Sequence, residues 1–339
     1  MSGNRNESLA AAPGRTLPGL LKASASTYGN RPWMRRKQSG LWRVYSWREG
    51  HDKVRHFSLG LTSLGFGPGH TLCIIGDSSP QWFWAQLAAQ AAGGNVLGVS
   101  RGWPAAQTAA AARQFGVQFV AVQDREQVEN LLGVKGEVPS LLKVIYWDAR
   151  GIEADREALL TSFDRVADTG RDLDASQSGA FDERTARIRP SEGAITRCDS
   201  VDGSAVSSRT LTHEGLLAAV EGLRLTDPFD TSDSWFSYTP AEGTVEQTMA
   251  LAGSLTSGMS IDFPENQQTA QQDLREVGST VACYPSAVWE ALAANITDRI
   301  EKTTFVKRMV ARMAGRAGST RADAALHGRQ PGGMSKVPP

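Results

Sequence analysis

The chain has 339 residues with 36 basic and 36 acidic side chains, no formal net charge, and a hydrophobic content of 40%. Such a composition indicates a globular protein, long enough for one large domain or two smaller ones with sizeable cores. Because a neutral chain lacks the positive field that attracts nucleic acid, we expect no nucleic-acid partner. Three scattered cysteines and five histidines without ligand spacing predict neither a disulfide framework nor a metal site.

The amino-terminal segment MSGNRNESLAAAPGR, residues 1–15, contains no apolar signal core, and we expect it to be flexible. The longest apolar run, residues 87–99, is too short and too rich in glycine to span a bilayer. These features predict a cytoplasmic protein.

Strands and helices are predicted to alternate over residues 16–167. A helix follows Thr16, and Ser46 with Glu49 forms an S-x-x-E capping box that opens a second one. Strands are expected at 31–37, 41–45, 71–76, 95–99, 117–122 and 142–147, with helices from Pro80, Pro104 and Asp124 and over 154–167. The alternation predicts an α/β subdomain with layered, mainly parallel sheets flanked by helices.

Residues 168–190 are polar and poor in aliphatic side chains, which predicts a connecting segment or a long surface loop. The alternation then resumes and indicates a second, incomplete α/β subdomain over 191–316. Its strands are expected at 192–196, 234–238, 259–263 and 279–283, and its helices at 212–223, 244–256, 267–277, 285–296 and 298–316. Residues 317–339 are expected to form a disordered tail.

Several stretches in this order resemble the adenylate-forming (AMP-binding) superfamily, and most closely its long-chain fatty acyl-CoA synthetases. They are SWREGHDKVRHFSLGLTSLGFGPGHTLCIIGDSSPQWFWAQLAAQAAGGNVLGV (46–99), DREQVENLL (124–132), LTHEGLL (211–217), VEQTMALAGSLTSGMSIDFPEN (245–266) and QQDLREVGSTVACYPSAVWE (271–290). The resemblance implies the first part of an adenylate-forming large domain. That family activates a fatty acid with ATP and passes the acyl group to coenzyme A.

The family's phosphate loop reads Tyr-Thr-Ser-Gly-Thr-Thr-Gly-x-Pro-Lys-Gly and precedes a helix. Matched without gaps from Thr212 and His213, its first glycine falls on Val201 and its lysine on Ser207. The phosphate-loop positions that the resemblance assigns are Ser200, Gly203, Ser204, Ser207, Thr212 and His213. They would belong to an ATP site whose loop is degenerate.

Physical chemistry argues against ATP binding by this loop. Val201 is β-branched and resists the positive φ that a glycine adopts, and Ser207 supplies no cation. Asp199 and Asp202 would each repel a phosphate at about 4 Å by roughly 4 kcal/mol, at an effective dielectric of about 20. We interpret the segment as a solvated linker between strand and helix, with an unusual nucleotide loop as the alternative.

Other retained residues have simple structural explanations. Thr212 fits a helix N-cap and His213 a surface or capping-turn position, while Trp82, Trp84 and Trp289 fit packing anchors. Glu246, beside Gln247, is a weak catalytic candidate because a carboxylate suits magnesium but alone makes no site.

The resemblance contains no counterpart of the family's later adenine and magnesium motifs or of its C-terminal catalytic lysine. We therefore expect a degenerate, truncated homologue that does not adenylate fatty acids by itself and acts as a binding or assembly protein. One alternative is an ATP- and Mg-dependent long-chain fatty acid–CoA ligase completed by a partner chain. Another is a remnant without activity. A fatty acid or acyl ligand is the expected small molecule.

Uncovered sheet edges would favour self-association or a protein partner. The basic segment 298–316 combines an apolar stripe with arginines and lysines. It fits a core-packed helix with a solvated basic face, and peripheral contact with an anionic membrane is the alternative.

Overall fold

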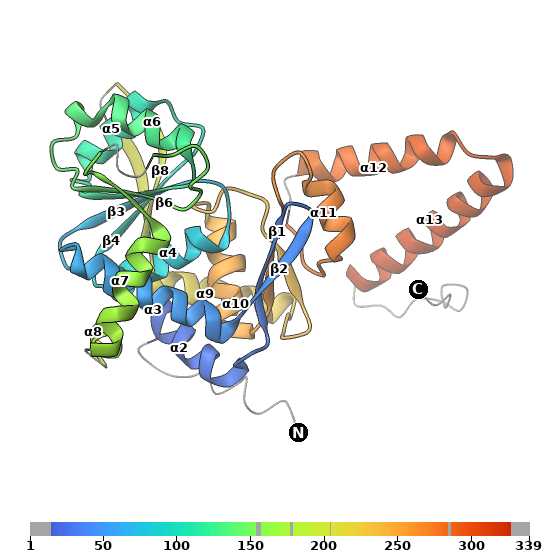
Figure 1. The fold of residues 1–339 in the computed structure, drawn as a ribbon. Helices are drawn as coiled ribbons and strands as arrows, with labels where there is room; N and C mark the ends of the chain where they lie inside the picture. The colour runs from blue at the N-terminus through green and yellow to red at the C-terminus, as the bar shows by residue number, and fades with distance from the viewer. Residues whose placement is uncertain (1–14, 154–156, 177–178, 204, 284–285, 327–339) are drawn as a thin grey trace. The chain divides into compact units, whose positions relative to one another are not determined.

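The structure, a computed structural model, describes residues 15–153, 157–176, 179–203, 205–283 and 286–326 (Figure 1). The chain divides into two compact units, residues 1–282 and 283–339. The predicted flexible segment therefore falls, except for Arg15, outside the described residues.

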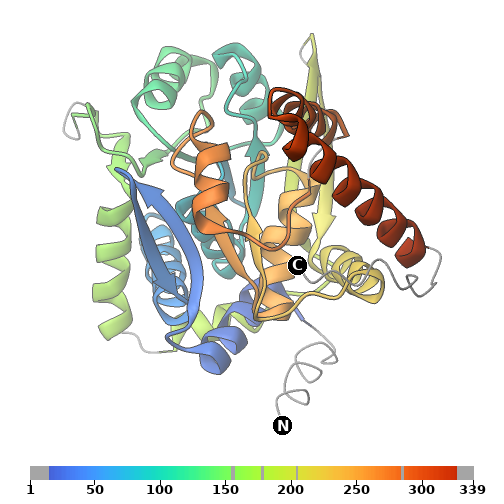
Figure 2. The ribbon, with the colours of Figure 1, turned by 90° about the vertical axis from the view of Figure 1, so that its right-hand side faces the viewer.

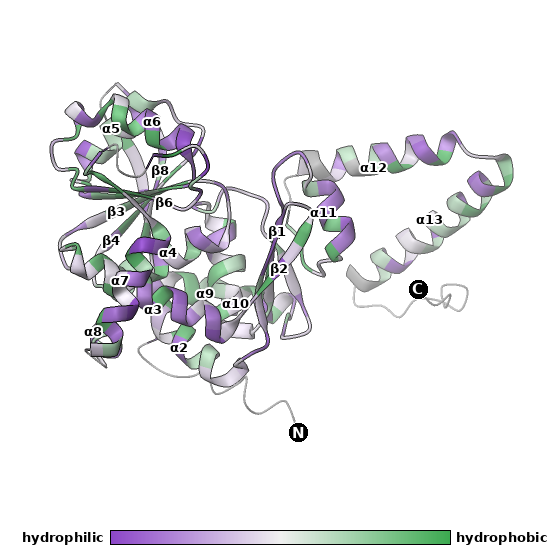
Figure 3. Ribbon diagram, in the orientation of Figure 1, coloured by the Kyte–Doolittle hydropathy of each residue, from purple (hydrophilic) through white to green (hydrophobic). Residues whose placement is uncertain are grey.

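The first unit contains a seven-stranded sheet in the order β7-β6-β5-β3-β4-β8-β9. All neighbours are parallel except β8 and β9, which are antiparallel. The strands are β3 (Thr71–Ile75), β4 (Asn95–Val99), β5 (Phe119–Val122), β6 (Lys143–Tyr146), β7 (Leu160–Ser162), β8 (Gly193–Asp202) and β9 (Ala205–Thr212). Figure 3 shows hydrophobic residues along the central strands, as expected for a parallel sheet buried on both faces.

A second sheet has four strands in the order β10-β11-β1-β2. They are β1 (Pro32–Gln38), β2 (Leu41–Ser46), β10 (Ser234–Phe236) and β11 (Ser260–Phe263). Only the β1–β2 pair is antiparallel. The layered, mainly parallel α/β architecture predicted from the sequence is thus confirmed.

Helices cover both faces of the seven-stranded sheet (Figure 1). One face carries α5 (Ala105–Gln114), α6 (Arg125–Gly133) and the short 3₁₀ turn η1 (Lys135–Glu137). The other carries α2 (Leu17–Tyr28), α3 (Trp47–Ser63), α4 (Pro80–Ala91), α7 (Phe163–Ser176), α8 (Ala180–Thr185) and α9 (His213–Thr226). The π-helix η3 (Glu246–Gly253), α10 (Ser254–Ser257) and α11 (Ala270–Val277) complete the unit.

Helix α4 forms the centre of the larger core. It starts at Ser79, whose hydroxyl accepts a hydrogen bond from the Trp82 amide at 3.4 Å. Phe83 contacts Phe263 of β11, and Trp84 contacts Tyr45 of β2, both in the four-stranded sheet. Helix α4 also packs against β3 and β4 of the seven-stranded sheet, so it joins both sheets. Of the predicted packing anchors, Trp82 and Trp84 are buried, at 0% and 2% exposure, whereas the prediction is wrong for Trp289, which is 49% exposed.

The predicted capping box of α3 is present. The Glu49 amide donates to the Ser46 hydroxyl at 3.2 Å, and the Ser46 amide donates to the Glu49 carboxylate at 2.7 Å. This reciprocal pair satisfies amides that the first helical turn leaves without partners.

Residues 168–190 are not the predicted long surface loop, because α7 and α8 occupy much of this segment. The predicted helix 154–167 begins only at Phe163, after β7. Gly170 lies so close to α3 that a Cβ there would be 1.7 Å from the His56 carbonyl oxygen. Helix α7 therefore packs tightly on α3 through a residue that carries no hydrophobic side chain.

Two predictions near the carboxyl terminus also need correction. The predicted strand 279–283 is a single bridge between Val281 and Trp235. The second unit contains α12 (Ser286–Glu301) and α13 (Phe305–Leu326), so the predicted helix 298–316 is divided between two helices. Helix α13 continues into the predicted disordered tail as far as Leu326, and 327–339 lie outside the described residues.

Candidate functional site

The predicted phosphate loop is the end of an antiparallel β-hairpin (Figure 2, yellow). Strands β8 and β9 pair from Gly193–Thr212 at the base to Asp202–Ala205 at the tip. Gly203 turns the chain with a φ of +59°, a conformation that favours glycine, and Ser204 lies outside the described residues. The predicted solvated linker is therefore wrong: this segment, residues 193–212, is a paired hairpin.

Pairing across the hairpin engages the other predicted loop residues. Ser200 lies opposite Ser207, on the two strands. On the outer edge of β9, the Val206 amide donates to Gln114 Oε1, and Gln114 Nε2 donates to the Val206 carbonyl, both at 2.9 Å. A phosphate nest needs converging N–H groups that are free to bind the anion. In the hairpin, the strands are instead paired up to the tip, and the Val206 amide is used by Gln114.

Asp199, at a bulge in β8, is neutralised by two arginines. Its carboxylate lies 2.6 Å from an Arg197 guanidinium nitrogen and 3.2 Å from Arg209 Nε. Arg197 also donates to the Thr244 hydroxyl at 3.1 Å, which connects the hairpin to the segment before Glu246. Sequence reasoning missed these arginines because their proximity to Asp199 depends on the strand register.

Thr212 and His213 lie together at the base of the hairpin. The Thr212 hydroxyl caps α9 by accepting from the Gly215 amide at 3.1 Å, which confirms the N-cap prediction. His213 lies in the first turn of α9, which fits the predicted capping-turn position, but it is only 1% exposed, so the surface alternative is wrong. Its Nδ1 accepts from the Leu17 amide at 3.3 Å, and burial lowers its pKa to about 4. The imidazole is therefore neutral near pH 7 and connects α9 to α2.

Glu246 is fully buried, and its two carboxylate oxygens accept from four donors. Trp235 Nε1 and the Ser237 hydroxyl donate to Oε2 at 3.0 and 2.7 Å. The Thr239 amide and hydroxyl donate to Oε1 at 3.0 and 2.9 Å. Burial raises the pKa of this carboxyl. Because these donors surround both oxygens, binding a magnesium ion would require some of them to move away.

Glu242 is a second buried acid, which the sequence did not reveal. It is 6% exposed, and burial raises the pKa of its carboxyl. A cavity of about 340 Å³ includes Glu242, Thr239, Ser100 and Arg101 in its lining. A buried acid with a raised pKa beside a cavity is a recognised sign of a functional site. The sequence signal was weak, because Glu242 belongs to no motif with a defined spacing.

A cleft of about 600 Å³ lies beyond the carboxyl ends of β3, β5 and β6. Its position follows from the topology. Helix α4, after β3, covers one face of the sheet, whereas α6, after the neighbouring β5, covers the other. The two connections diverge between adjacent strands and leave a crevice, which is where open α/β sheets bind ligands. We call it the switch-point cleft.

Charges of both signs line the switch-point cleft. Arg101 contacts Asp77 and lies 2.9 Å from the Asp124 carboxylate. Arg36 donates instead to two carbonyl oxygens, those of Ser78 at 3.0 Å and Glu265 at 3.3 Å. Burial lowers the pKa of the Arg36 guanidinium, and its Nε has no hydrogen-bond partner among the described residues. This arrangement is suited to binding a polar ligand.

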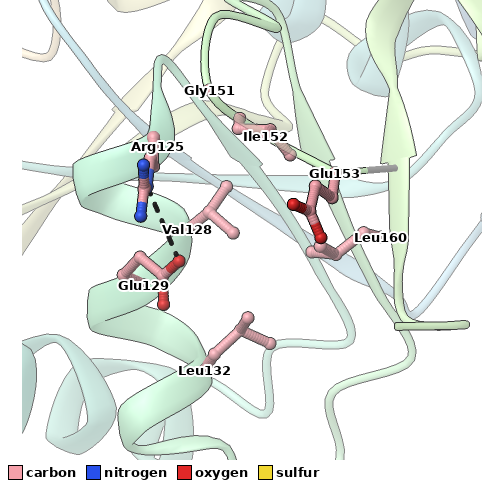
Figure 4. A pocket seen from close by; sticks show the side chains of 8 residues that line it. All are labelled: Arg125, Val128, Glu129, Leu132, Gly151, Ile152, Glu153 and Leu160. Carbon is pink, nitrogen blue, oxygen red and sulfur yellow. Dashed lines mark ion pairs between the residues drawn. The ribbon is translucent and has the colours of Figure 1, made fainter. Parts of the chain in front are cut away.

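A smaller pocket lies beside α6 (Figure 4). Its volume is about 80 Å³, and Arg125 and Glu129 form an ion pair at its edge with 3.8 Å between charged atoms. Ile152 and Leu160 supply apolar lining. Its size is sufficient for a few water molecules but not for an acyl chain or a nucleotide.

No group of three or more His, Cys, Asp or Glu side chains among the described residues is placed to hold a metal ion. Among the helices that the structure describes, none combines the length and apolar character needed to cross a membrane.

Comparison with known proteins shows similarity to one class of enzymes. Residues 21–185 match the family model described as AMP-binding enzyme. This match and the relatives below confirm the predicted relationship to the adenylate-forming superfamily. A long-chain-fatty-acid–CoA ligase, ACSBG2, from Xenopus laevis is 23% identical over 90% of this chain and 42% of its own length. The human protein of that name is 21% identical over 86% of this chain and 44% of its own length.

Solved structures agree on the fold. A long-chain-fatty-acid-CoA ligase (FadD1) from Archaeoglobus fulgidus superposes with a TM-score of 0.63 at 16% identity, over 79% of this chain and 51% of that one. VinN superposes with a TM-score of 0.66 at 15% identity, over 85% of this chain and 65% of that one. The chain spans about two fifths of the length of the curated relatives that it matches over most of its own length.

Proposed function

We propose that this chain does not adenylate fatty acids by itself and serves as a binding or assembly protein built on an adenylate-forming fold. Its expected small-molecule ligand is a fatty acid or an acyl group, by analogy with the relatives named long-chain-fatty-acid–CoA ligase. One observation carries the proposal: the segment aligned with the family's phosphate loop is a hairpin paired to its turn.

The charges around this hairpin support the same proposal. The two arginines closest to Asp199 form ion pairs with that carboxylate, so their charge is already partly compensated. Ser207, at the position of the family's lysine, supplies no charge at all. A triphosphate here would have to displace Asp199 from its arginines and open the strand pairing, and each step opposes binding.

ATP–pyrophosphate exchange tests the first part of the proposal. The purified full chain, with magnesium and a long-chain fatty acid, is expected to give no exchange above a protein-free control. Circular dichroism and a cooperative thermal transition establish that the protein is folded. Exchange that depends on the fatty acid would overturn the proposal.

Displacement of a fluorescent fatty acid tests the second part. Saturable binding without exchange supports a binding role, whereas no binding by the folded chain contradicts it.

A ligase completed by a partner chain is the second candidate, favoured by the names of the relatives and by the retained Glu246 and Gln247. Exchange that appears only when a separate chain carrying the family's C-terminal motifs is added would establish that candidate.

We further propose that the first unit self-associates or binds a protein partner. Strand β2 is at the end of its sheet and exposes Leu41 and Val44, at 75% and 48%. Unpaired strand edges with apolar side chains favour association. Sedimentation velocity of the full chain tests self-association: a concentration-dependent increase in mass is expected, and a stable monomer would contradict self-association.

A further inference from the structure

Helix α13 presents an exposed apolar stripe. Phe305, Val306, Met309, Val310 and Met313 are 72%, 62%, 48%, 58% and 66% exposed. At about 100° per residue, these five side chains occupy a sector of the helix about 140° wide. Large apolar side chains clustered in this way usually mark a surface that contacts another molecule.

Cations lie on both borders of this stripe. Arg308, Arg312 and Arg316 follow one border at intervals of four residues, and Lys307 and Arg321 lie on the other side. The arginines of the first border and the apolar side chains beside them line a groove of about 430 Å³. Figure 3 shows the alternation of hydrophilic and hydrophobic residues along α13.

The charge of this region is strongly one-sided. Between Lys302 and Ala322 the sequence contains six cationic residues and no acid. Within the part of this unit that the structure describes, the observed ion pair joins Lys302 to Asp298, and none involves a cation of α13. Helix α13 itself carries five cations and one acid, Asp323 in its last turn, so a net positive charge lies beside the stripe.

The combination of an apolar stripe with flanking cations distinguishes between the possible binding partners of α13. A protein core over the stripe would desolvate arginines that have no counter-ion, which is costly. A second copy of α13 would place like charges close together, which is also unfavourable. An anionic lipid surface accepts both features, because apolar side chains enter the headgroup boundary while flanking lysines and arginines extend to the phosphates.

We propose that α13 is an interfacial helix that attaches the protein to an anionic membrane surface. The apolar stripe lies in the headgroup region, and the flanking cations contact lipid phosphates. The proposal is independent of the function proposed above, because it involves neither the hairpin nor a fatty-acid ligand.

Vesicle co-sedimentation with the full chain tests this proposal. Binding is expected to vesicles of phosphatidylcholine containing about 30% phosphatidylserine and to be at least about tenfold weaker with phosphatidylcholine alone. Replacing three border cations together, in Arg308→Gln/Arg312→Gln/Arg316→Gln, should weaken binding by about tenfold or more. The apolar variant Met309→Ser/Met313→Ser should weaken binding to both kinds of vesicle.

A matched control removes the same charge elsewhere. Arg165→Gln/Arg171→Gln/Arg189→Gln changes three exposed arginines of the first unit and should bind vesicles like the parent chain. Equal binding to neutral and anionic vesicles, an equal loss in the control, or no binding at all would overturn the proposal. So would a dimer that Met309→Ser/Met313→Ser dissociates, because the stripe would then be a protein interface.

Discussion

Two small-residue segments follow strands of the same sheet, yet they form opposite structures. The segment GDSSP, residues 76–80, follows β3 and leads directly into α4. The segment CDSVDGSAVSS, residues 198–208, folds back on itself and reaches α9 only after a second strand. The first borders two cavities, whereas the second is closed by strand pairing.

The difference teaches that composition alone does not make a ligand loop. Asp77 and Asp199 both contact arginines, but Asp77 lies where connections diverge beyond parallel strands. At that place the backbone must leave the sheet, and a crevice results. The hairpin returns antiparallel at the edge of the sheet, so its backbone groups find partners and no crevice opens. Four substitutions can break or sharpen this comparison.

The largest expected effect concerns His213 at the base of the hairpin. Its pKa is lowered by burial from 6.5 to about 4 in the folded state. Between these values the unfolded chain takes up a proton that the folded chain does not, so stability falls as the pH falls. The parent chain should lose about 3 kcal/mol relative to His213→Gln between about pH 7 and pH 4. Urea unfolding across this range measures the difference, and parallel curves would contradict the assignment.

A similar but smaller loss is expected for Gly98→Val, between the cleft and the hairpin. Gly98 lies opposite Arg197 of β8, and a Cβ there would be 2.5 Å from the Glu242 Cβ. The added side chain must push Glu242 or Ile195 away and should destabilise the fold by about 2–3 kcal/mol. The matched control is Gly102→Ala, where the nearest atom is 4.0 Å away. Equal unfolding midpoints for both variants would show that this packing is looser than described.

Glu246→Gln should cost about 2 kcal/mol. The amide group of glutamine would face an N–H donor, that of Trp235 or of Thr239, where the carboxylate now accepts. At least one buried donor then loses its partner. Because Ser237 also contacts Ser78 at 2.5 Å, the change should disturb the loop beside the switch-point cleft. Chemical denaturation gives the cost, and a stability equal to that of the parent chain would mean that the network is dispensable.

The smallest effect is expected for Asp199→Asn in the hairpin. Its ion pairs with Arg197 and Arg209 are partly exposed to water, so the loss should be about 0.5–1 kcal/mol. High salt should reduce the difference between variant and parent, since screening weakens such pairs. A loss above about 2 kcal/mol would mean that the hairpin depends on this charge cluster rather than on strand pairing.

Much of the first α/β region could be predicted because its local signals agree with its packing. The capping box of α3 and the strand Asn95–Val99 appear as expected. The error at 168–190 has a specific cause. The buried face of α7 consists of Phe163, Val166, Ala167 and then Gly170, and a glycine gives no hydrophobic signal. Gly170 instead allows α7 to approach α3 closely, and this role can be recognised only when the position of α3 is known.

The candidate site was harder to predict. The sequence identified the altered phosphate-loop segment and the retained Glu246, but it missed Arg197, Arg209 and Glu242. The neighbours of each of these three residues come from distant parts of the chain and are brought close by strand register or burial. Periodicity and spacing report on local neighbours and cannot locate such contacts.

The sequence by itself determined the α/β class, most of its strands and helices, and the relationship to adenylate-forming proteins. Alternating apolar runs, caps and ordered motifs suffice for these conclusions, because they act over short distances. Only the tertiary structure decided that the segment after Cys198 is a hairpin, that His213 is buried, and that the cleft opens beside Asp77. The physical reason is that strand order, burial and the direction of each connection are set by contacts between distant segments.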